Sequence, residues 1–170
     1  MNYKILGAGL IIVSCGGFGI CIAGAYRAQI RILHKILYMT DLMESELTYR
    51  LTPLPELCRK VGRSVGGVVC CVLVKLAEEL ERQILPDVPS CMSCVLSSVD
   101  RLPRSAERIF NTLGSSLGQY DLPGQLKGLE SVRASCSRTL HALEQNRENR
   151  IRSYQTLGFC AGAALVILFI

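Results

Sequence analysis

The longest uncharged segment is the feature that most constrains how this chain can fold. It runs from Ile5 to Tyr26 and reads ILGAGLIIVSCGGFGICIAGAY. As an α-helix, these 22 residues would rise ~33 Å, more than the ~30 Å thickness of the hydrocarbon core of a bilayer. The sequence therefore predicts an N-terminal transmembrane helix over residues 1–26.

Two cleavable signals are the alternatives to this anchor. Lys4, the apolar run and Ala23-Gly24-Ala25 resemble a secretory signal with small residues at its cleavage site. Ile12-Val13-Ser14-Cys15 resembles a lipoprotein box. However, the run is long, stays apolar after Cys15 and passes without a break into a helical pattern, so we favour an uncleaved anchor.

A second uncharged segment, Leu157–Ile170, stands at the other end of the sequence. Its 14 residues would rise only ~21 Å as a helix, which is short for a complete span. The preceding polar residues, Tyr154–Thr156, can lengthen it. We expect residues 156–170 to form a second transmembrane helix, and the alternative is an interfacial or buried helix.

The charges beside these two segments predict the orientation of the chain. Positive residues follow the first segment and precede the second: Arg27, Arg31, Lys35, Arg147, Arg150 and Arg152. Lys4 and the terminal amine are the positive groups on the other side. Positively charged flanks stay in the cytoplasm, so we expect residues 27–155 to form a cytoplasmic domain.

The composition excludes two broad classes of protein. With 49% hydrophobic residues, the chain is too apolar for intrinsic disorder. A net charge of +5, with no Lys/Arg cluster interleaved with aromatic residues, argues against a nucleic-acid-binding protein.

The nine cysteines do not predict disulfides or a metal site. Their number is odd, their spacing is irregular, and a cytoplasmic domain is kept reduced, so most are expected to be small buried hydrophobic residues. A zinc site at the CxxC motif, Cys91–Cys94, would need a second pair of ligands. Cys58 or Cys70-Cys71 would make a poor second pair, and no histidine is nearby. We therefore expect no metal and no cofactor.

The middle of the chain reads as helices throughout. Apolar residues at helical spacing, including Leu33, Leu37 and Met43, predict that the first helix continues to Leu51. The prolines of LTPLPEL (residues 51–57) stop it, because a residue before proline disfavours the helical region, and they begin a short helix that should end at Gly62.

Further helices follow this short one. Residues 68–74 are apolar and β-branched and could form a strand, but no second strand is available, so we interpret them as the buried start of a helix whose apolar face ends at Ile84. Short helices are expected over residues 89–99 and 103–117. A last helix of ~70 Å should run from near Gly124 to the C-terminus. The sequence thus predicts an all-α antiparallel bundle between two membrane helices.

The stretch LGSSLGQYDLPGQL (residues 113–126) has three competing interpretations. A catalytic site would use Asp121 as acid or base with Gln125 beside it, but the two histidines, His34 and His141, are isolated, and no nucleotide-binding loop or nucleophile–base set is present. A packing motif would use Gly114 and Gly118, a GxxxG pair, for a close helix contact.

The third interpretation, a corner between two helices, explains the most residues. Gly118 can end one helix in the left-handed conformation. Asp121 is a strong N-cap for the next helix, and Leu122 and Pro123 suit its first turn. We therefore favour a corner that sets the direction of the longest helix.

The order of these features resembles the stage III sporulation protein AB family. The resemblance covers essentially the whole chain, from the apolar N-terminus through LTPLPEL and LGSSLGQYDLPGQLKGLE to a charged helix ending in YQTLG. It singles out structural or partner-contact positions at Thr52, Pro53, Leu54, Pro55, Glu56, Gly114, Gly118, Asp121 and Gln125.

The resemblance implies a function as well as a fold. Members look like the cytoplasmic F-type domain of the platform proteins in type II secretion and type IV pilus systems. The resemblance implies a non-catalytic membrane platform in the channel between mother cell and forespore, located in the mother-cell membrane. It implies that a cytoplasmic ATPase and other channel subunits bind this platform. Homo-oligomers are also compatible with the resemblance. The alternative is a lipid-anchored or secreted helical adaptor on the outer face of the membrane.

Overall fold

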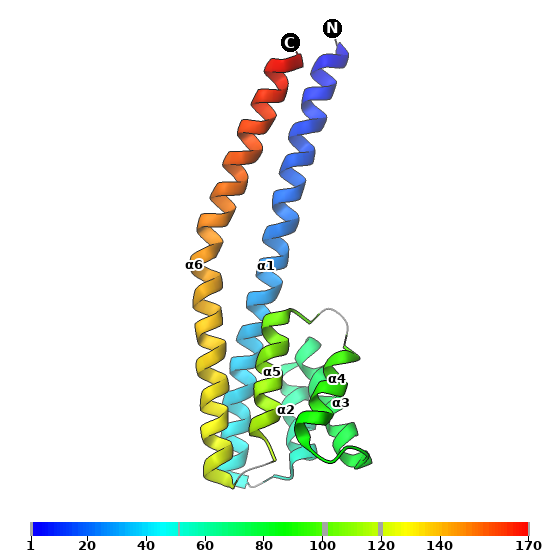
Figure 1. Ribbon diagram of the computed structural model, residues 1–170, viewed down its shortest axis with the longest axis vertical. Helices are drawn as coiled ribbons and strands as arrows, with labels where there is room; N and C mark the ends of the chain where they lie inside the picture. Colours follow the sequence, from blue (N-terminus) through cyan, green and yellow to red (C-terminus); the bar gives the residue numbers. More distant parts are fainter. Residues whose placement is uncertain (1, 51, 100–101, 119–120, 170) are drawn as a thin grey trace. The chain divides into compact units, whose positions relative to one another are not determined.

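The computed structural model of the chain is all-α in the part that it describes. That part covers the backbone of residues 2–50, 52–99, 102–118 and 121–169, and the side-chain surroundings of residues 24–50, 52–99, 102–118 and 121–145. These residues form helices and contain no β-strand, so the predicted all-α fold is confirmed. The helices are α1 (Asn2–Arg50), α2 (Leu54–Val65), α3 (Gly67–Arg82), α4 (Val88–Ser97), α5 (Arg104–Ser116) and α6 (Leu122–Phe169) (Figure 1).

The chain divides into two compact units. Unit 1 comprises Met1–Ile30 and His141–Ile170, and unit 2 comprises Arg31–Leu140. The membrane segments expected at residues 1–26 and 156–170 belong to unit 1 and, apart from Gly24–Tyr26, lie outside the residues with described surroundings. Among the described residues, no helix offers an apolar stretch long enough to cross a bilayer.

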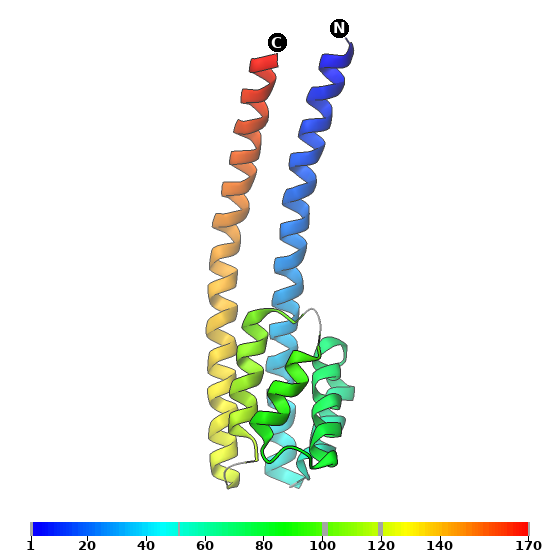
Figure 2. The same ribbon diagram turned by 45° about the vertical axis from the view of Figure 1, so that its right-hand side comes forward.

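Within unit 2, the ends of the two long helices run antiparallel. The Cys136 thiol of α6 donates a hydrogen bond of 3.3 Å to the Leu33 carbonyl of α1. Arg133, earlier on α6, forms ion pairs with Asp41 and Glu44, which come later on α1. The two helices therefore run in opposite directions. The short helices α2 to α5 are also antiparallel neighbours in chain order, as Figures 1 and 2 show.

Proline builds the corner between α1 and α2. Pro53 has φ −54° and ψ 141°, an extended conformation, and Pro55 sits in the first turn of α2, where no backbone donor is required. Glu46 of α1 then accepts hydrogen bonds from Thr52 (3.4 Å) and from Lys60 of α2 (2.8 Å). The Lys60 hydrogen bond is the main reason why the pKa of Glu46 is lowered.

Helix α2 does not end at Gly62, so that prediction is wrong. The helix continues to Val65, and Gly62 is buried against α3, where an added Cβ would lie 3.3 Å from the Leu73 Cβ. The glycine therefore serves close helix packing. The chain turns later, at Gly66 and Gly67, whose φ angles of 68° and 69° favour glycine.

Helix α3 contains residues 68–74, which confirms the helical interpretation over the strand. The expectation that Ile84 belongs to its apolar face is wrong, because the helix ends at Arg82 and Gln83 adopts the left-handed conformation with φ 53°. Ile84 therefore leaves the helix and is 74% exposed.

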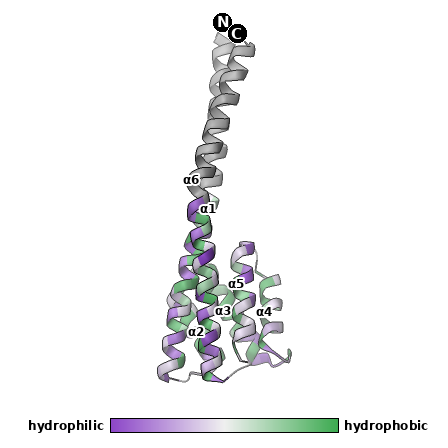
Figure 3. Ribbon diagram, turned by 60° about the vertical axis from the view of Figure 1, so that its left-hand side comes forward, coloured by the Kyte–Doolittle hydropathy of each residue, from purple (hydrophilic) through white to green (hydrophobic). Residues whose placement is uncertain are grey.

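The core of unit 2 receives large apolar side chains from all six helices. Hydrophobic residues alternate with hydrophilic ones around the helices, as Figure 3 shows. On α1 the buried face includes Ile36 and Met39, whereas the expected Leu37 is only half-buried. Among the largest fully buried side chains are Leu33, Met43, Leu57, Leu73, Met92, Ile109, Phe110 and Leu113.

Candidate functional site

The proline motif LTPLPEL (residues 51–57) and the glycine motif LGSSLGQYDLPGQL (residues 113–126) meet at one end of unit 2. A Cβ added to Gly118 would lie 3.7 Å from the Leu54 Cδ2, which places the α1–α2 corner beside the α5–α6 corner. The same added Cβ would lie 2.6 Å from the Val88 Cγ2, at the start of α4. We call this the corner end; it is the lower end of the helices in Figure 1.

The corner interpretation of residues 113–126 is confirmed at Gly118. Helix α5 ends at Ser116, and Gly118 follows with φ +79°, in the region that side chains with a Cβ rarely adopt. The chain can therefore reverse between α5 and α6 within a few residues.

The packing interpretation also holds, so the two are not exclusive. A Cβ added to Gly114 would lie 2.8 Å from the Met92 Cβ of α4, and the one added to Gly118 would meet Val88, one turn earlier on α4. The glycine pair thus forms a smooth strip on which α4 lies. The partners Val88 and Met92 were missed in the sequence, although their own spacing of four residues matches that of the glycines.

Asp121 caps α6, as its position before Leu122 predicted. Its Oδ1 accepts a hydrogen bond of 3.2 Å from the Gly124 amide, and its backbone carbonyl accepts one of 3.0 Å from the Gln125 amide. The carboxylate thus satisfies a first-turn donor that the helix itself leaves unpaired. Gln125 is half-buried in the first turn of α6.

The motif residues of the α1–α2 corner divide into a structural group and an exposed group. Thr52, Leu54 and Pro55 are half-buried and make or support the contacts described above. Pro53 and Glu56 are exposed. These two side chains are therefore available to a partner.

We expect Asp121→Asn and Asp121→Ser to leave stability nearly unchanged, because both side chains can accept the same hydrogen bond from the Gly124 amide. Asp121→Ala should lower the free energy of unfolding by ~1 kcal/mol. Denaturant unfolding of the full-length variants in detergent, followed by circular dichroism, measures both. Loss of function in Asp121→Asn with unchanged stability would show that the negative charge itself is used, and would contradict a purely structural role.

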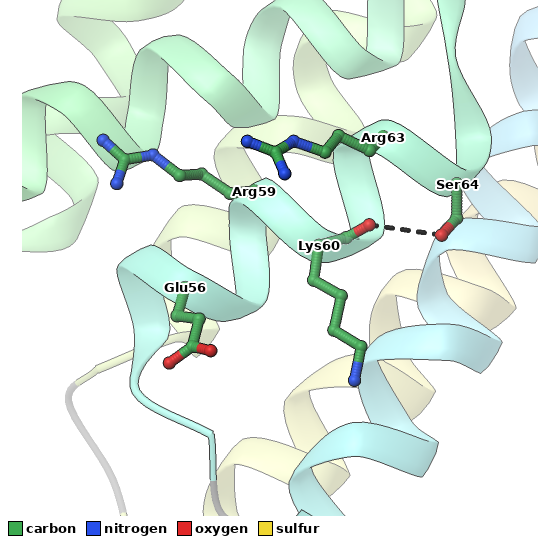
Figure 4. Close-up of a pocket in the computed structure, with 5 residues that line it drawn as sticks. All are labelled: Glu56, Arg59, Lys60, Arg63 and Ser64. Carbon is green, nitrogen blue, oxygen red and sulfur yellow. Dashed lines mark hydrogen bonds between the residues drawn. The ribbon is translucent and has the colours of Figure 1, made fainter.

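The outer face of α2 carries an open depression of about 450 Å³, lined by Glu56, Arg59, Lys60, Arg63 and Ser64 (Figure 4). Two of its cations are engaged within the bundle. Arg59 pairs with Glu81 through two contacts of 2.6 Å, and Lys60 pairs with Glu46 at 2.7 Å. All five lining residues come from α2, so the depression is walled on one side and is open to solvent.

The cysteines differ in exposure more than the sequence predicted. Cys58, Cys91 and Cys136 are buried, and burial raises the pKa of Cys58 to about 12 and that of Cys136 to about 11. Cys71 and Cys94 are exposed. In the CxxC motif one thiol is buried and the other exposed, and the described residues contain no cluster of three potential metal ligands.

Comparison with known proteins agrees with this arrangement of motifs. The family model for stage III sporulation protein AB matches residues 4–170. The chain belongs to the stage III sporulation protein AB family. The match includes both motifs of the corner end and the two apolar segments.

Two relatives of this family illustrate the similarity. A stage III sporulation protein AB from Bacillus subtilis (strain 168) is 22% identical over 175 residues, which cover 97% of this chain and 98% of the relative. A solved structure of a stage III sporulation protein AB matches with a TM-score of 0.61 and 16% identity, over 72% of this chain and 98% of that chain. At this identity the structural likeness supports the fold.

Proposed function

We propose that this chain is a non-catalytic platform subunit of a secretion-like membrane complex that acts in endospore formation. The observation that carries the proposal is the meeting of both family motifs at the corner end, where their half-buried members fix the two corners and their exposed members face outward. Such an arrangement suits a rigid surface that a partner protein recognises.

The proposed location is the mother-cell membrane around the forespore, with unit 2 in the cytoplasm. The apolar segments at residues 1–26 and 156–170 are proposed to span that membrane. The positive residues beside them support this orientation, because positively charged flanks stay in the cytoplasm. Both long helices then enter unit 2 from the same membrane.

The proposed partners are the other channel subunits and a cytoplasmic ATPase. The sequence has no nucleotide-binding loop, so energy for any movement would come from another protein. We assign the ATPase contact to the corner end, where α1 ends at residue 50 and α6 begins at residue 122. This end lies far along both helices from residues 31 and 140, at which the two helices leave unit 2. Glu56, Tyr49 (83% exposed) and Ile84 offer exposed charge and apolar area at this end.

The orientation is tested with a membrane-impermeant maleimide and mass-spectrometric mapping of the labelled cysteines. Cys71 and Cys94 are suitable reporters because they are exposed, whereas buried Cys58 should stay unlabelled on either side. We expect Cys71 and Cys94 to react in inside-out vesicles and to be protected in right-side-out spheroplasts. Labelling in spheroplasts would instead support an adaptor on the outer face.

The partner contact is tested by photo-crosslinking in sporulating cells. A photoreactive amino acid at position 56 should crosslink to an ATPase, and the same amino acid at Ser97, exposed near the other end of unit 2, should not. Equal crosslinking from both positions, or crosslinking from position 97 alone, would contradict the assignment of the corner end.

A further inference from the structure

The end of unit 2 opposite the corner end carries a group of exposed arginines. We call it the double-glycine end, after the Gly66–Gly67 turn. Lys35 of α1 reaches it, since its Nζ donates a hydrogen bond of 3.3 Å to the Gly66 carbonyl. The exposed arginines of this end, which come from α1, α2 and α5, are Arg31, Arg63, Arg104 and Arg108.

Antiparallel packing brings these arginines to the same end. Arg31 lies one turn before Lys35, and Arg63 lies in the last turn of α2. Arg104 is the first residue of α5, a helix whose other end reaches the corner end at Gly118. Residues from three separate parts of the sequence thus contribute positive charge to one end of the bundle.

These arginines differ in pairing from three basic residues nearer the corner end, whereas Arg50 and Lys127 of that end are also exposed and outside the ion pairs of the described residues. Arg59, Lys60 and Arg82 each form an ion pair, with Glu81, Glu46 and Glu79 respectively. Within the described part of the chain, the side chains of the four arginines at the double-glycine end form no ion pair or hydrogen bond with another side chain. Glu107 is the carboxylate in the first turn of α5, and among the described residues named here it stands against four arginines and Lys35.

The double-glycine end is also the end at which α1 continues toward the uncharged run. Arg31 is the first residue of unit 2, and only four residues separate it from Tyr26, the last residue of that run. If residues 5–26 span the bilayer, as the proposed function requires, the double-glycine end is the part of unit 2 that follows the membrane segment most closely along the chain.

We propose that the double-glycine end of unit 2 binds the anionic headgroups of the same membrane that the two apolar segments enter. The inference rests on the proposed membrane insertion and adds a second attachment, made by the short helices. Guanidinium groups recognise phosphate through paired N–H donors, and each basic residue near an anionic surface adds attraction that falls off within a Debye length. The corner end offers fewer unpaired cations, because Arg59, Lys60 and Arg82 are held in ion pairs.

The test compares full-length protein reconstituted into vesicles of phosphatidylcholine alone and into vesicles with equal parts of phosphatidylglycerol. Hydrogen–deuterium exchange is measured over residues 60–70 and 102–110. We expect several-fold slower exchange with the anionic lipid, and loss of this difference in 1 M salt, where the Debye length is ~3 Å. Inorganic phosphate added to the neutral vesicles should not reproduce it.

A charge-matched pair of variants completes the experiment. Arg63→Gln, Arg104→Gln and Arg108→Gln together should abolish the lipid-dependent protection, whereas Arg50→Gln, Arg82→Gln and Lys127→Gln together should preserve it, with both variants retaining wild-type helicity. Equal exchange in both lipids, equal loss in both variants, or protection by phosphate alone would overturn the inference. Failure to float with neutral vesicles would instead contradict membrane insertion, and with it the proposed function.

Discussion

Replacing Gly118 by valine is expected to lower the free energy of unfolding by ~3 kcal/mol. A left-handed conformation costs a residue with a Cβ roughly 1–2 kcal/mol, and Gly118 has φ +79°. An added Cβ would also lie 2.6 Å from the Val88 Cγ2, and such overpacking typically costs a further ~1–3 kcal/mol. Denaturant unfolding of the full-length chain in detergent, followed by circular dichroism, measures the loss.

Ser115→Val is the matched control for this variant. Ser115 is exposed within α5, so the same β-branched residue is placed there on ordinary helical backbone and loses only the hydrogen bond of 2.8 Å from the Ser115 hydroxyl to the Thr112 carbonyl. We expect a loss of no more than ~0.5 kcal/mol at this surface position. If both variants lost equal stability, the effect would come from valine in this segment and not from the conformation and contacts of Gly118.

Gly128→Ala is expected to lower the free energy of unfolding by ~2 kcal/mol, although alanine is favoured over glycine within a helix by ~1 kcal/mol. The reason is the contact between α5 and α6. A Cβ added to Gly128 would overlap the Ser116 Cβ and lie 3.3 Å from the Ser116 Cα, so the two helices would have to separate. Unfolding in denaturant gives the sign as well as the size of the change.

The double variant Ser116→Gly, Gly128→Ala isolates this contact. Removing the Ser116 Cβ makes room for the new methyl group, so the double variant should be more stable than the sum of the two single changes predicts. Strict additivity, or a stabilising effect of Gly128→Ala alone, would show that α5 and α6 do not approach closely at this position.

The sequence predicted the helices well because local chemistry determines where most of them begin and end. Pro53 and Pro55 stop α1 and start α2, and Asp121 caps α6 through the Gly124 amide. These signals act within a few residues, so they can be interpreted without knowing the rest of the fold. The two exceptions, Gly62 and Ile84, are instructive.

Gly62 was predicted to end a helix, yet it lies inside α2 because Leu73 of α3 packs against it. A glycine that ends a helix and one that admits a neighbouring helix look the same in a sequence. Ile84 follows the apolar period of α3, but the left-handed Gln83 ends that period first. In both cases, the deciding interaction or backbone angle is not encoded in the local pattern.

The candidate site was predicted only in part, because some of its features follow from local chemistry and others from packing between helices. The left-handed Gly118 and the cap at Asp121 follow from local rules, whereas the contacts of Gly114 with Met92 and of Gly118 with Val88 depend on how α4 lies on α5. The ion pair that joins Glu46 to Lys60 likewise requires the α1–α2 corner to be formed. Residues far apart in sequence meet here through packing that periodicity alone does not specify.

Leu54 and Val88 lie next to the space that a side chain at position 118 would occupy. This arrangement has a consequence for how sequences of this family can diverge. A larger residue at position 118 would need a smaller residue at 88, whereas Leu54 would remain in ordinary contact with the added Cβ at 3.7 Å. A larger residue at position 118 is therefore expected to be tolerated only in combination with a smaller residue at position 88. Position 88 of α4, which belongs to neither motif, would thus be inherited together with position 118.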